Sequence, residues 1–220
     1  MVSLDFAAVL VDWPLLLRGL ALTAGLTAVS ATLGLALGIA CAWARLHGGT
    51  SLRLAAATYI ELIHNTPFIE QRFCVIFGLP SLGLKLSPEW AALIAMVINL
   101  GAYAAEIARA GIQATPRGQI EAARSLALTE AQVFLRVVLP PALARVWPAM
   151  VGQIVIVMLG SAVCGQIATQ ELSYYANLIH SRNFRAFEAT FIATALYLGL
   201  AVLLRHLLQR LGTRLLHVRR

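Results

Sequence analysis

The sequence has little charge. Only 12% of its 220 residues are Asp, Glu, Lys or Arg, whereas a soluble domain of ordinary composition has about 25%. Hydrophobic residues make up 60% of the chain, and its mean hydropathy is +0.79. These values exclude an ordinary soluble domain and indicate an integral membrane protein.

Cysteine and lysine are also scarce, and this excludes several kinds of site. The three cysteines, Cys41, Cys74 and Cys164, lie in apolar runs and form no CxxC pair, so we expect buried thiols. The one lysine, Lys85, is followed by Leu86, so the chain has no Gly-Lys-Ser/Thr motif and is not a P-loop ATPase. The five histidines are scattered. We therefore expect neither catalysis nor a bound metal or cofactor in this chain.

The net charge of +7 is not distributed as in a nucleic-acid-binding protein. The basic residues lie in short segments between apolar blocks, which is typical of membrane topology, and we expect no nucleic-acid partner. The opening stretch MVSLDFAAVLVDW contains no Lys or Arg. Because a cleaved signal peptide begins with a positive segment, we expect none here.

Five segments are long and apolar enough to cross a bilayer, since a span needs about 20 mostly apolar residues. They cover approximately residues 15–44, 55–77, 90–110, 142–167 and 186–208. The sequence therefore predicts one all-α integral membrane domain with five transmembrane helices. Gly34 and Gly38 form a GxxxG pair in the first span, which favours close helix packing in lipid.

The placement of arginine predicts the orientation of these spans. With the N-terminus outside, twelve of the seventeen basic residues lie on the inner side and four on the outer side. This asymmetry satisfies the positive-inside rule and predicts a cytoplasmic C-terminus. The inner residues are Arg45, Arg53, Arg109, Arg117, Arg124, Arg136, Arg145, Arg205, Arg210, Arg214, Arg219 and Arg220, and the outer ones are Arg18, Lys85, Arg182 and Arg185.

A polar stretch, 115–141, separates the third and fourth spans and therefore faces the cytoplasm. Thr115 is expected to cap a first short helix, and Thr129 and Gln132 form a capping box for a second. The second helix is expected to end near Leu139, because two prolines follow it. The apolar residues of this hairpin indicate either a docking site for a soluble partner or an amphipathic hairpin on the membrane surface. They are Ile120, Ala123, Leu126, Val133, Phe134 and Val137.

Ionisable residues within spans are functional candidates, because a charge in the bilayer is costly. Glu70 and Arg72 lie in the second span, just after Pro67, which can kink it. They indicate either a solute pathway or a structural ion pair with another helix or subunit, and their spacing of two predicts that they face different neighbours. Uncharged polar groups in spans form interhelical hydrogen bonds or bind solute. Those of interest are Asn99, Gln153, Ser161 and Gln166.

Several motifs resemble one family of membrane proteins. The polar stretch is similar to the EAA loop of the membrane subunits of bacterial ABC importers, in Glu121-Ala122-Ala123, Leu126 and Leu139-Pro140. Other segments resemble the permeases for polar amino acids: YIELIHNTP (59–67), FGLP (77–80), LSP (86–88) and NLGAYAAEIARAGIQ (99–113). The resemblance extends over nearly the whole chain.

The resemblance implies a type I ABC importer permease in the bacterial cytoplasmic membrane, moving a polar amino acid or close analogue. It further implies that the hairpin docks on a separate ATP-binding subunit, which holds ATP and Mg²⁺. A second permease subunit, identical or homologous, and an external solute-binding protein complete the expected assembly.

The chain departs from the family pattern at positions that bear on the solute. Ala127 stands where the family usually has Gly, and a left-handed conformation there would cost about 1–2 kcal/mol. Glu70 and Arg72 replace residues that are commonly apolar, and His64 replaces a frequent Arg. Leu-Gly-Ser-Ala (159–162) replaces a common Lys-Asp-Thr-Ser. The resemblance therefore does not identify the solute.

Two other classes of protein remain as alternatives. One is a self-contained ion-coupled carrier, against which five spans without an internal repeat argue. The other is a membrane anchor without transport, against which the intramembrane Glu70 and Arg72 argue. Only the importer requires an ATP-binding subunit that copurifies with the chain.

Overall fold

The computed structural model describes residues 4–81, 83, 86–166 and 168–216, and this part of the chain contains helices and no β-strand. Lys85, Ile167, Arg219 and Arg220 lie outside the described residues. The helices are α1 (Ala7–Leu10), α2 (Trp13–His47), α3 (Thr50–His64), α4 (Phe68–Phe73), α5 (Leu79–Ser81), α6 (Pro88–Gln113), α7 (Arg117–Ser125), α8 (Glu130–Gln132), α9 (Leu139–Gly160), α10 (Ala162–Gly165), α11 (Leu172–Asn183) and α12 (Ala186–Leu215). Two π-helical segments, η1 (Cys74–Gly78) and η2 (Val133–Val138), complete the set.

Within the described residues, four continuous helical stretches are long and apolar enough to span a membrane. They are α2, α6, the stretch Glu130–Gly165 that contains α9, and Ala186–Arg214 of α12. The predicted all-α membrane fold is confirmed, but the predicted number of five spans is not.

The predicted second span, 55–77, is not one continuous helix. Its residues form the greater part of α3 and, after a break at Asn65, Thr66 and Pro67, α4 and most of η1. Pro67 adopts an extended conformation, with φ −61° and ψ 142°, directly before α4. Because Pro also disfavours the helical region for the residue before it, Thr66 cannot continue α3. The break divides one apolar segment into two short helices.

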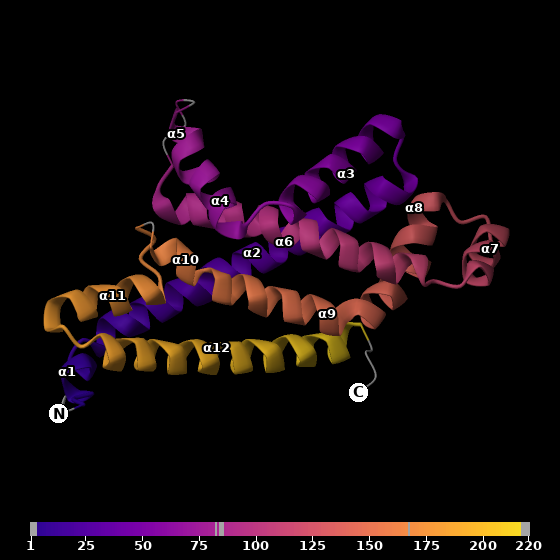
Figure 1. Cartoon of the computed structure of the whole chain (residues 1–220). Coiled ribbons are helices and arrows are strands. Elements are labelled where there is room, and N and C mark those ends of the chain that lie inside the picture. The colour runs from indigo at the N-terminus through magenta and orange to yellow at the C-terminus, as the bar shows by residue number, and fades with distance from the viewer. Residues whose placement is uncertain (1–3, 82, 84–85, 167, 217–220) are drawn as a thin grey trace.

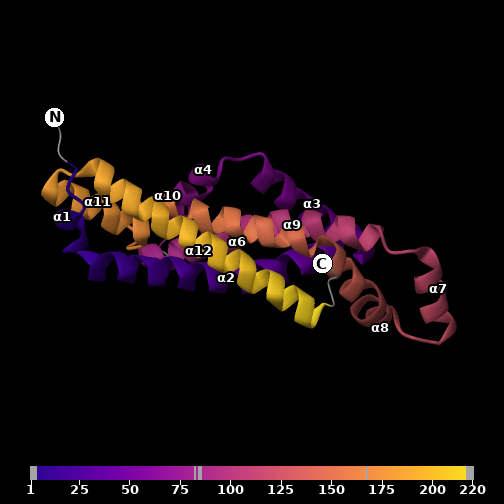
Figure 2. The same cartoon turned by 90° about the horizontal axis from the view of Figure 1, so that it is seen from below.

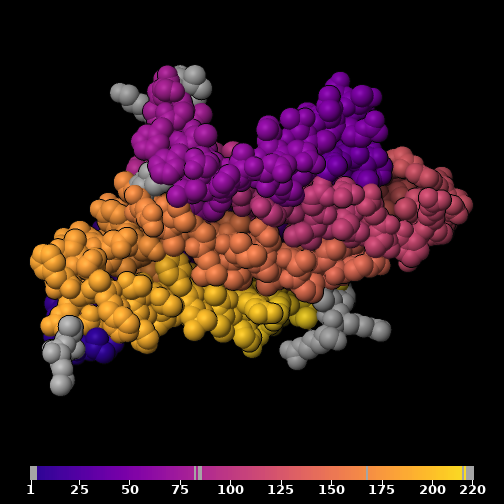
Figure 3. Space-filling model, viewed as in Figure 1, coloured from indigo at the N-terminus to yellow at the C-terminus, as the bar shows by residue number. Residues whose placement is uncertain are grey.

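The four long helices run beside one another, and the short helices lie at the ends and on one side (Figures 1 and 2). α1 and α11 lie at one end of the bundle, and α7 and α8 lie at the other. α3 and the α4–α5 segment rise from the same side as two separate arms, with a hollow between them (Figure 3). α12 runs from the α11 end to the hairpin end of the bundle.

Small residues bring α2 and α6 into close contact. A Cβ added at Gly34 would lie 2.9 Å from Leu100, and one added at Gly38 would lie 2.6 Å from the Cβ of Ala104. Neither position has room for a larger side chain without displacing the other helix. The GxxxG pair is therefore a packing feature, as such pairs are in lipid.

The two prolines led us to expect that the helix after the hairpin turn ends near Leu139, and this prediction is wrong. η2 continues directly into α9, which begins at Leu139 with Pro140 and Pro141 in its first turn. A proline lacks an N–H and its ring collides with the carbonyl four residues earlier. The regular ladder gives way to the π-helical turns of η2 directly before these prolines, and both prolines then lie in the first turn of α9, where proline is tolerated. The hairpin is therefore joined to α9 by continuous helix.

Candidate functional site

The hairpin at one end of the bundle is closed by local hydrogen bonds. The predicted capping box is present: Thr129 N donates to Gln132 Oε1 at 2.9 Å, and Gln132 N donates to Thr129 Oγ1 at 3.4 Å. The predicted cap at Thr115 is wrong, because its hydroxyl is buried without a hydrogen-bond partner. Pro116 occupies the capping position in an extended conformation, and α7 begins at Arg117. The Thr115 side chain is therefore one residue too far from the first turn.

The turn after α7 is a Schellman motif with an alanine in the left-handed position. Leu128 N donates to Ala123 O at 3.4 Å and Ala127 N donates to Arg124 O at 2.9 Å, which is the pattern of that motif. Ala127 has φ 55°. The expected cost of alanine in place of the usual glycine therefore applies.

An ion pair crosses this turn. Arg124 donates to both carboxylate oxygens of Glu130, at 2.8 and 3.0 Å. This hydrogen bonding, with the negative charge of Glu130, raises the pKa of Arg124 above its ordinary value. The pair holds α7 and α8 together across the strained alanine.

The predicted coupling residues do not lie on one surface. Ala123 is only 5% exposed and packs inside the hairpin with Val133 and Phe134. Leu139 is half-buried against the same cluster, and Pro140 lies at the start of α9. The residues that remain on the outer edge of the hairpin are Glu121, Ala122 and Leu126, of which Leu126 is 76% exposed.

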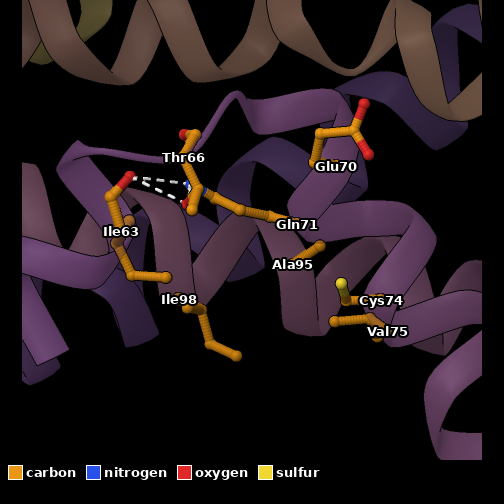
Figure 4. A pocket seen from close by; sticks show the side chains of 8 residues that line it. All are labelled: Ile63, Thr66, Glu70, Gln71, Cys74, Val75, Ala95 and Ile98. Carbon is orange, nitrogen blue, oxygen red and sulfur yellow. Dashed lines mark hydrogen bonds between the residues drawn. The ribbon is translucent and has the colours of Figure 1, made fainter.

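A second group of polar residues surrounds the break between α3 and α4. The side chain of Gln71 donates from Nε2 to Ile63 O at 2.8 Å, to Thr66 O at 3.0 Å and to Thr66 Oγ1 at 3.1 Å (Figure 4). Asn99 on α6 donates from Nδ2 to Gln71 Oε1 at 3.0 Å. Gln71 thus satisfies carbonyls that the broken helix leaves free. It was not predicted, although a glutamine four residues after Pro67 in an apolar segment is a signal that could have found it.

Two cavities lie at this break. The first, which we call the polar cavity, has a volume of about 220 Å³ and is lined by Thr66, Phe68, Asn99, Tyr103, Gln153, Ile156 and Val157. The second has a volume of about 270 Å³ and is lined by Ile63, Thr66, Glu70, Gln71, Cys74, Val75, Ala95 and Ile98 (Figure 4). Asn99 and Glu70 therefore line different cavities, with Gln71 and Thr66 near both.

Arg72 is fully buried, and its partners are not acidic. Its guanidinium donates to Gly160 O and lies 3.6 Å above the Phe68 ring. Glu70 is exposed and points away from the Gln71 contacts (Figure 4), and no ion pair is found for it in the described part of the chain. As their spacing predicts, the two residues face different neighbours.

The other two candidates, Ser161 and Gln166, are separated from the polar cavity. Ser161 is fully buried and follows Gly160, whose carbonyl accepts from Arg72. Gln166 is exposed at the end of α10. The structure therefore brings Arg72 close to the backbone beside Ser161, but it does not gather the five candidates into one site.

A fully buried carboxylate, Glu171, was missed by the sequence analysis. It accepts hydrogen bonds from the hydroxyl of Tyr197 and from Tyr174 N, the latter at 3.0 Å, and it caps α11. Thr23 of α2 also donates to it at 3.5 Å. These contacts fasten α11 to α2 and α12 at the end of the bundle opposite the hairpin.

A helical membrane bundle with a polar cavity between its helices and a capped hairpin at one end has the architecture of a membrane transport protein. Residues 34–217 match the family described as "Binding-protein-dependent transport system inner membrane component". The chain belongs to this family and is a permease component of the amino-acid ABC importer group.

Curated relatives align along almost the entire chain. The arginine transport system permease protein ArtQ of Bacillus subtilis (strain 168) is 32% identical over 203 residues, which is 92% of this chain and 93% of ArtQ. The glutamine transport system permease protein GlnP of Escherichia coli (strain K12) is 32% identical over 213 residues, covering 96% of this chain and 97% of GlnP. The two relatives carry different solute names.

Solved structures show the same fold. The crystal structure of an amino acid ABC transporter with histidines has a TM-score of 0.86 and 34% identity, covering 97% of this chain and all of that one (100%). An inward-facing structure of the MetNI methionine ABC transporter has a TM-score of 0.75 at 22% identity, with 95% and 98% coverage. The latter shows likeness of fold alone.

Proposed function

We propose that this chain is the membrane permease subunit of an importer that moves a polar amino acid or a close analogue, driven by a separate ATP-binding subunit. In this proposal ATP and Mg²⁺ are bound by that partner, and the chain itself catalyses no reaction. The relatives support the class of solute through their names, which include arginine and glutamine permeases.

The observation that carries the proposal is the outer edge of the hairpin. Leu126 is 76% exposed beside the exposed Ala122 and Glu121, at the end of the bundle where α7 projects (Figure 1). An apolar side chain ringed by small and charged residues on a rigid element suits docking to a protein. The capping box, the Arg124–Glu130 pair and the Schellman turn supply the rigidity.

The continuous helix from the hairpin into the bundle offers a mechanical route. The stretch Glu130–Gly165 runs from the hairpin turn, past Gln153 in the polar cavity, to Gly160, which holds Arg72. A movement of the hairpin would therefore displace one wall of the cavity as part of the same helix. This is how ATP-driven closure of a partner would open or close the solute route.

The orientation and the remaining partners follow from the same arrangement. We propose that the hairpin and the end of α12 face the cytoplasm and that the N-terminus and α11 face outward, in keeping with the arginine asymmetry. The outward end would then meet a solute-binding protein. A second permease, identical or homologous, would pair with this one in the bacterial cytoplasmic membrane.

The solute route is proposed to pass the broken helix. Of the five candidates, Asn99 has the strongest support, because it lines the polar cavity, whereas Glu70 lines the neighbouring one. Arg72 and Ser161 are buried beside the route, and Gln166 is exposed beyond it. The polar lining of the cavity within an apolar bundle supports passage of a polar solute.

Crosslinking tests the proposal. Leu126→Cys should crosslink to the copurifying ATP-binding subunit, whereas Phe184→Cys, exposed at the opposite end, should not. Leu126→Asp should lower ATP-dependent uptake in proteoliposomes and leave membrane insertion unchanged. Uptake driven by an ion gradient, by the chain without any ATP-binding subunit, would instead identify a self-contained carrier.

A further inference from the structure

We infer that the polar cavity accepts an uncharged side chain that donates a hydrogen bond, such as a primary amide, and that Gln71 sets this preference through Asn99. The inference rests on the proposed function, because it assigns a class of solute to that same route. It follows from the direction of the hydrogen bonds at the helix break and from the chemistry of the cavity wall.

The direction of the hydrogen bonds begins at the broken backbone. The carbonyl oxygens of Ile63 and Thr66 can only accept, so the group of Gln71 that meets both of them must be its NH₂ group. The remaining side-chain oxygen of Gln71 can also only accept. Asn99 must therefore turn its own NH₂ group toward Gln71. The orientation of both amides is fixed by the two backbone carbonyls.

This relay leaves the carbonyl oxygen of Asn99 as an acceptor. Asn99 lines the polar cavity, and one of the two N–H groups on its Nδ2 is engaged by Gln71, while its Oδ1 remains the acceptor that it offers to a solute. Thr66 contributes less, because its hydroxyl already donates to Leu62 O at 2.8 Å and accepts from Gln71. A solute group that pairs with this oxygen must bring an N–H or O–H.

The rest of the cavity wall is neutral. Tyr103 and Gln153 are its other polar members, and the remaining ones are apolar. The nearby charges do not line this cavity: Arg72 donates from Nη2 to Gly160 O and lies over the Phe68 ring, with its Nε and Nη1 buried and without a hydrogen-bond partner among the described residues, and Glu70 lines the second cavity. A charged side chain would lose its hydration here, and no lining residue carries an opposite charge. An amide or hydroxyl loses less and can pair with the amide of Gln153.

The size of the cavity agrees with a small polar group. Its volume of about 220 Å³ is below the roughly 300–1,000 Å³ of pockets for drug-sized ligands. The cavity also lies between Asn99, near the middle of α6, and Gln153 on α9. A solute held there would sit between the two helices that move relative to each other when α9 is displaced.

Direct binding to the purified permease–ATPase complex, without the external binding protein, tests the inference. The probes are radiolabelled L-glutamine, L-arginine and L-glutamate, with the γ-methyl ester of L-glutamate as an uncharged probe that lacks the side-chain donor. We expect L-glutamine to bind tighter than each of the other three by about tenfold or more. The side chains of L-glutamate and the ester lack the donor that a site built around a hydrogen bond requires, and L-arginine brings a charge that the cavity wall does not pair.

Two substitutions of Asn99 separate charge from hydrogen bonding. Asn99→Asp places a negative charge at the acceptor. It should strengthen the binding of L-arginine and weaken the binding of L-glutamine, changing the ratio of the two affinities by about tenfold or more. Asn99→Leu should weaken the binding of L-glutamine without strengthening the binding of L-arginine. The matched control is Thr194→Val on α12, since Thr194 is exposed there and its hydroxyl donates to Thr190 O within its own helix. It should leave all four affinities unchanged.

Gln71→Met tests the relay itself. Without the glutamine, Asn99 is free to present either its oxygen or its NH₂ group to the cavity. Discrimination between L-glutamine and the methyl ester should then narrow, which a loss of packing alone would not produce. If this variant does not assemble, the Asn99 variants decide the matter.

Three outcomes would overturn the inference. They are wild-type binding of L-arginine or L-glutamate at least as tight as that of L-glutamine, an unchanged ranking in Asn99→Asp, and no binding of any probe by a complex with intact ATPase activity. Failure of an ATP-binding subunit to copurify is a different result, which counts against the proposed function.

Discussion

Ala122 and Ala123 are neighbours in the hairpin, yet an aspartate should act differently at each. Ala122 is exposed, whereas Ala123 is 5% exposed and packs with Val133 and Phe134. A carboxylate at 123 would be buried without a partner, and an uncompensated buried charge costs about 3–5 kcal/mol. At 122 the same change should alter stability by no more than about 0.5 kcal/mol. Ala123→Asp should therefore unfold the hairpin, and Ala122→Asp should disturb only docking.

Hydrogen–deuterium exchange of the hairpin amides measures this difference. A loss of about 3 kcal/mol corresponds to roughly a hundredfold loss of protection, which we expect throughout α7 and α8 in Ala123→Asp. In Ala122→Asp protection should match the wild type, while binding of the ATP-binding subunit and uptake both fall. Both variants should insert into the membrane normally, since neither residue lies in a long apolar helix.

Wild-type protection of the hairpin in Ala123→Asp would refute this reasoning. It would mean that the side chain at 123 reaches water or a partner rather than the interior of the hairpin. The docking surface would then include Ala123, as the motif alone predicts. Equal loss of protection in both variants would show instead that the hairpin tolerates no charge on either face.

Three further predictions concern other parts of the chain. Ala127→Gly relieves the folded hairpin of a left-handed conformation that costs about 1–2 kcal/mol, and it stabilises the unfolded state by about 0.4–1 kcal/mol, because glycine is freer there. The first effect is larger, so the hairpin amides should exchange slightly more slowly; faster exchange would contradict this. Arg72→Leu should reduce assembly yield more than Glu70→Leu, because only Arg72 is buried, and the double variant should show the sum of both effects; recovery in the double variant would reveal a direct pair. Ser87→Cys should react with an impermeant reagent from outside and a reporter fused after Arg220 should be cytoplasmic; the reverse labelling would invert the topology.

Much of the fold could be predicted because apolar length and local capping are properties of short segments. The long helices α2, α6 and α12 follow from runs of apolar residues, and the capping box at Thr129 follows from a spacing of three. The cost at Ala127 could also be anticipated, since a turn between two short helices commonly needs a left-handed residue. Each of these features depends on residues close together in the chain.

Whether a proline ends a helix could not be predicted from the sequence alone. Pro67 breaks a helix, whereas Pro140 and Pro141 do not, because η2 adjusts the preceding turns and nothing comparable precedes Pro67. The sequence shows prolines in both places but not which backbone will adapt. That choice depends on the packing of Val133 and Val138 against the neighbouring helices, which holds η2 in place.

The sequence by itself determined that this chain is a helical membrane protein with a capped hairpin, because hydropathy and capping act through neighbouring residues. Only the tertiary structure decided which side of the hairpin is exposed, turning Ala123 inward and Leu126 outward. It also decided which polar residues meet: Gln71 and Asn99 are 28 positions apart and form one relay, while Glu70 and Arg72 are two apart, yet Arg72 donates to Gly160 O and Glu70 lines the second cavity. Contacts between helices depend on their relative rotation and packing, and these are set by the whole bundle rather than by any one segment.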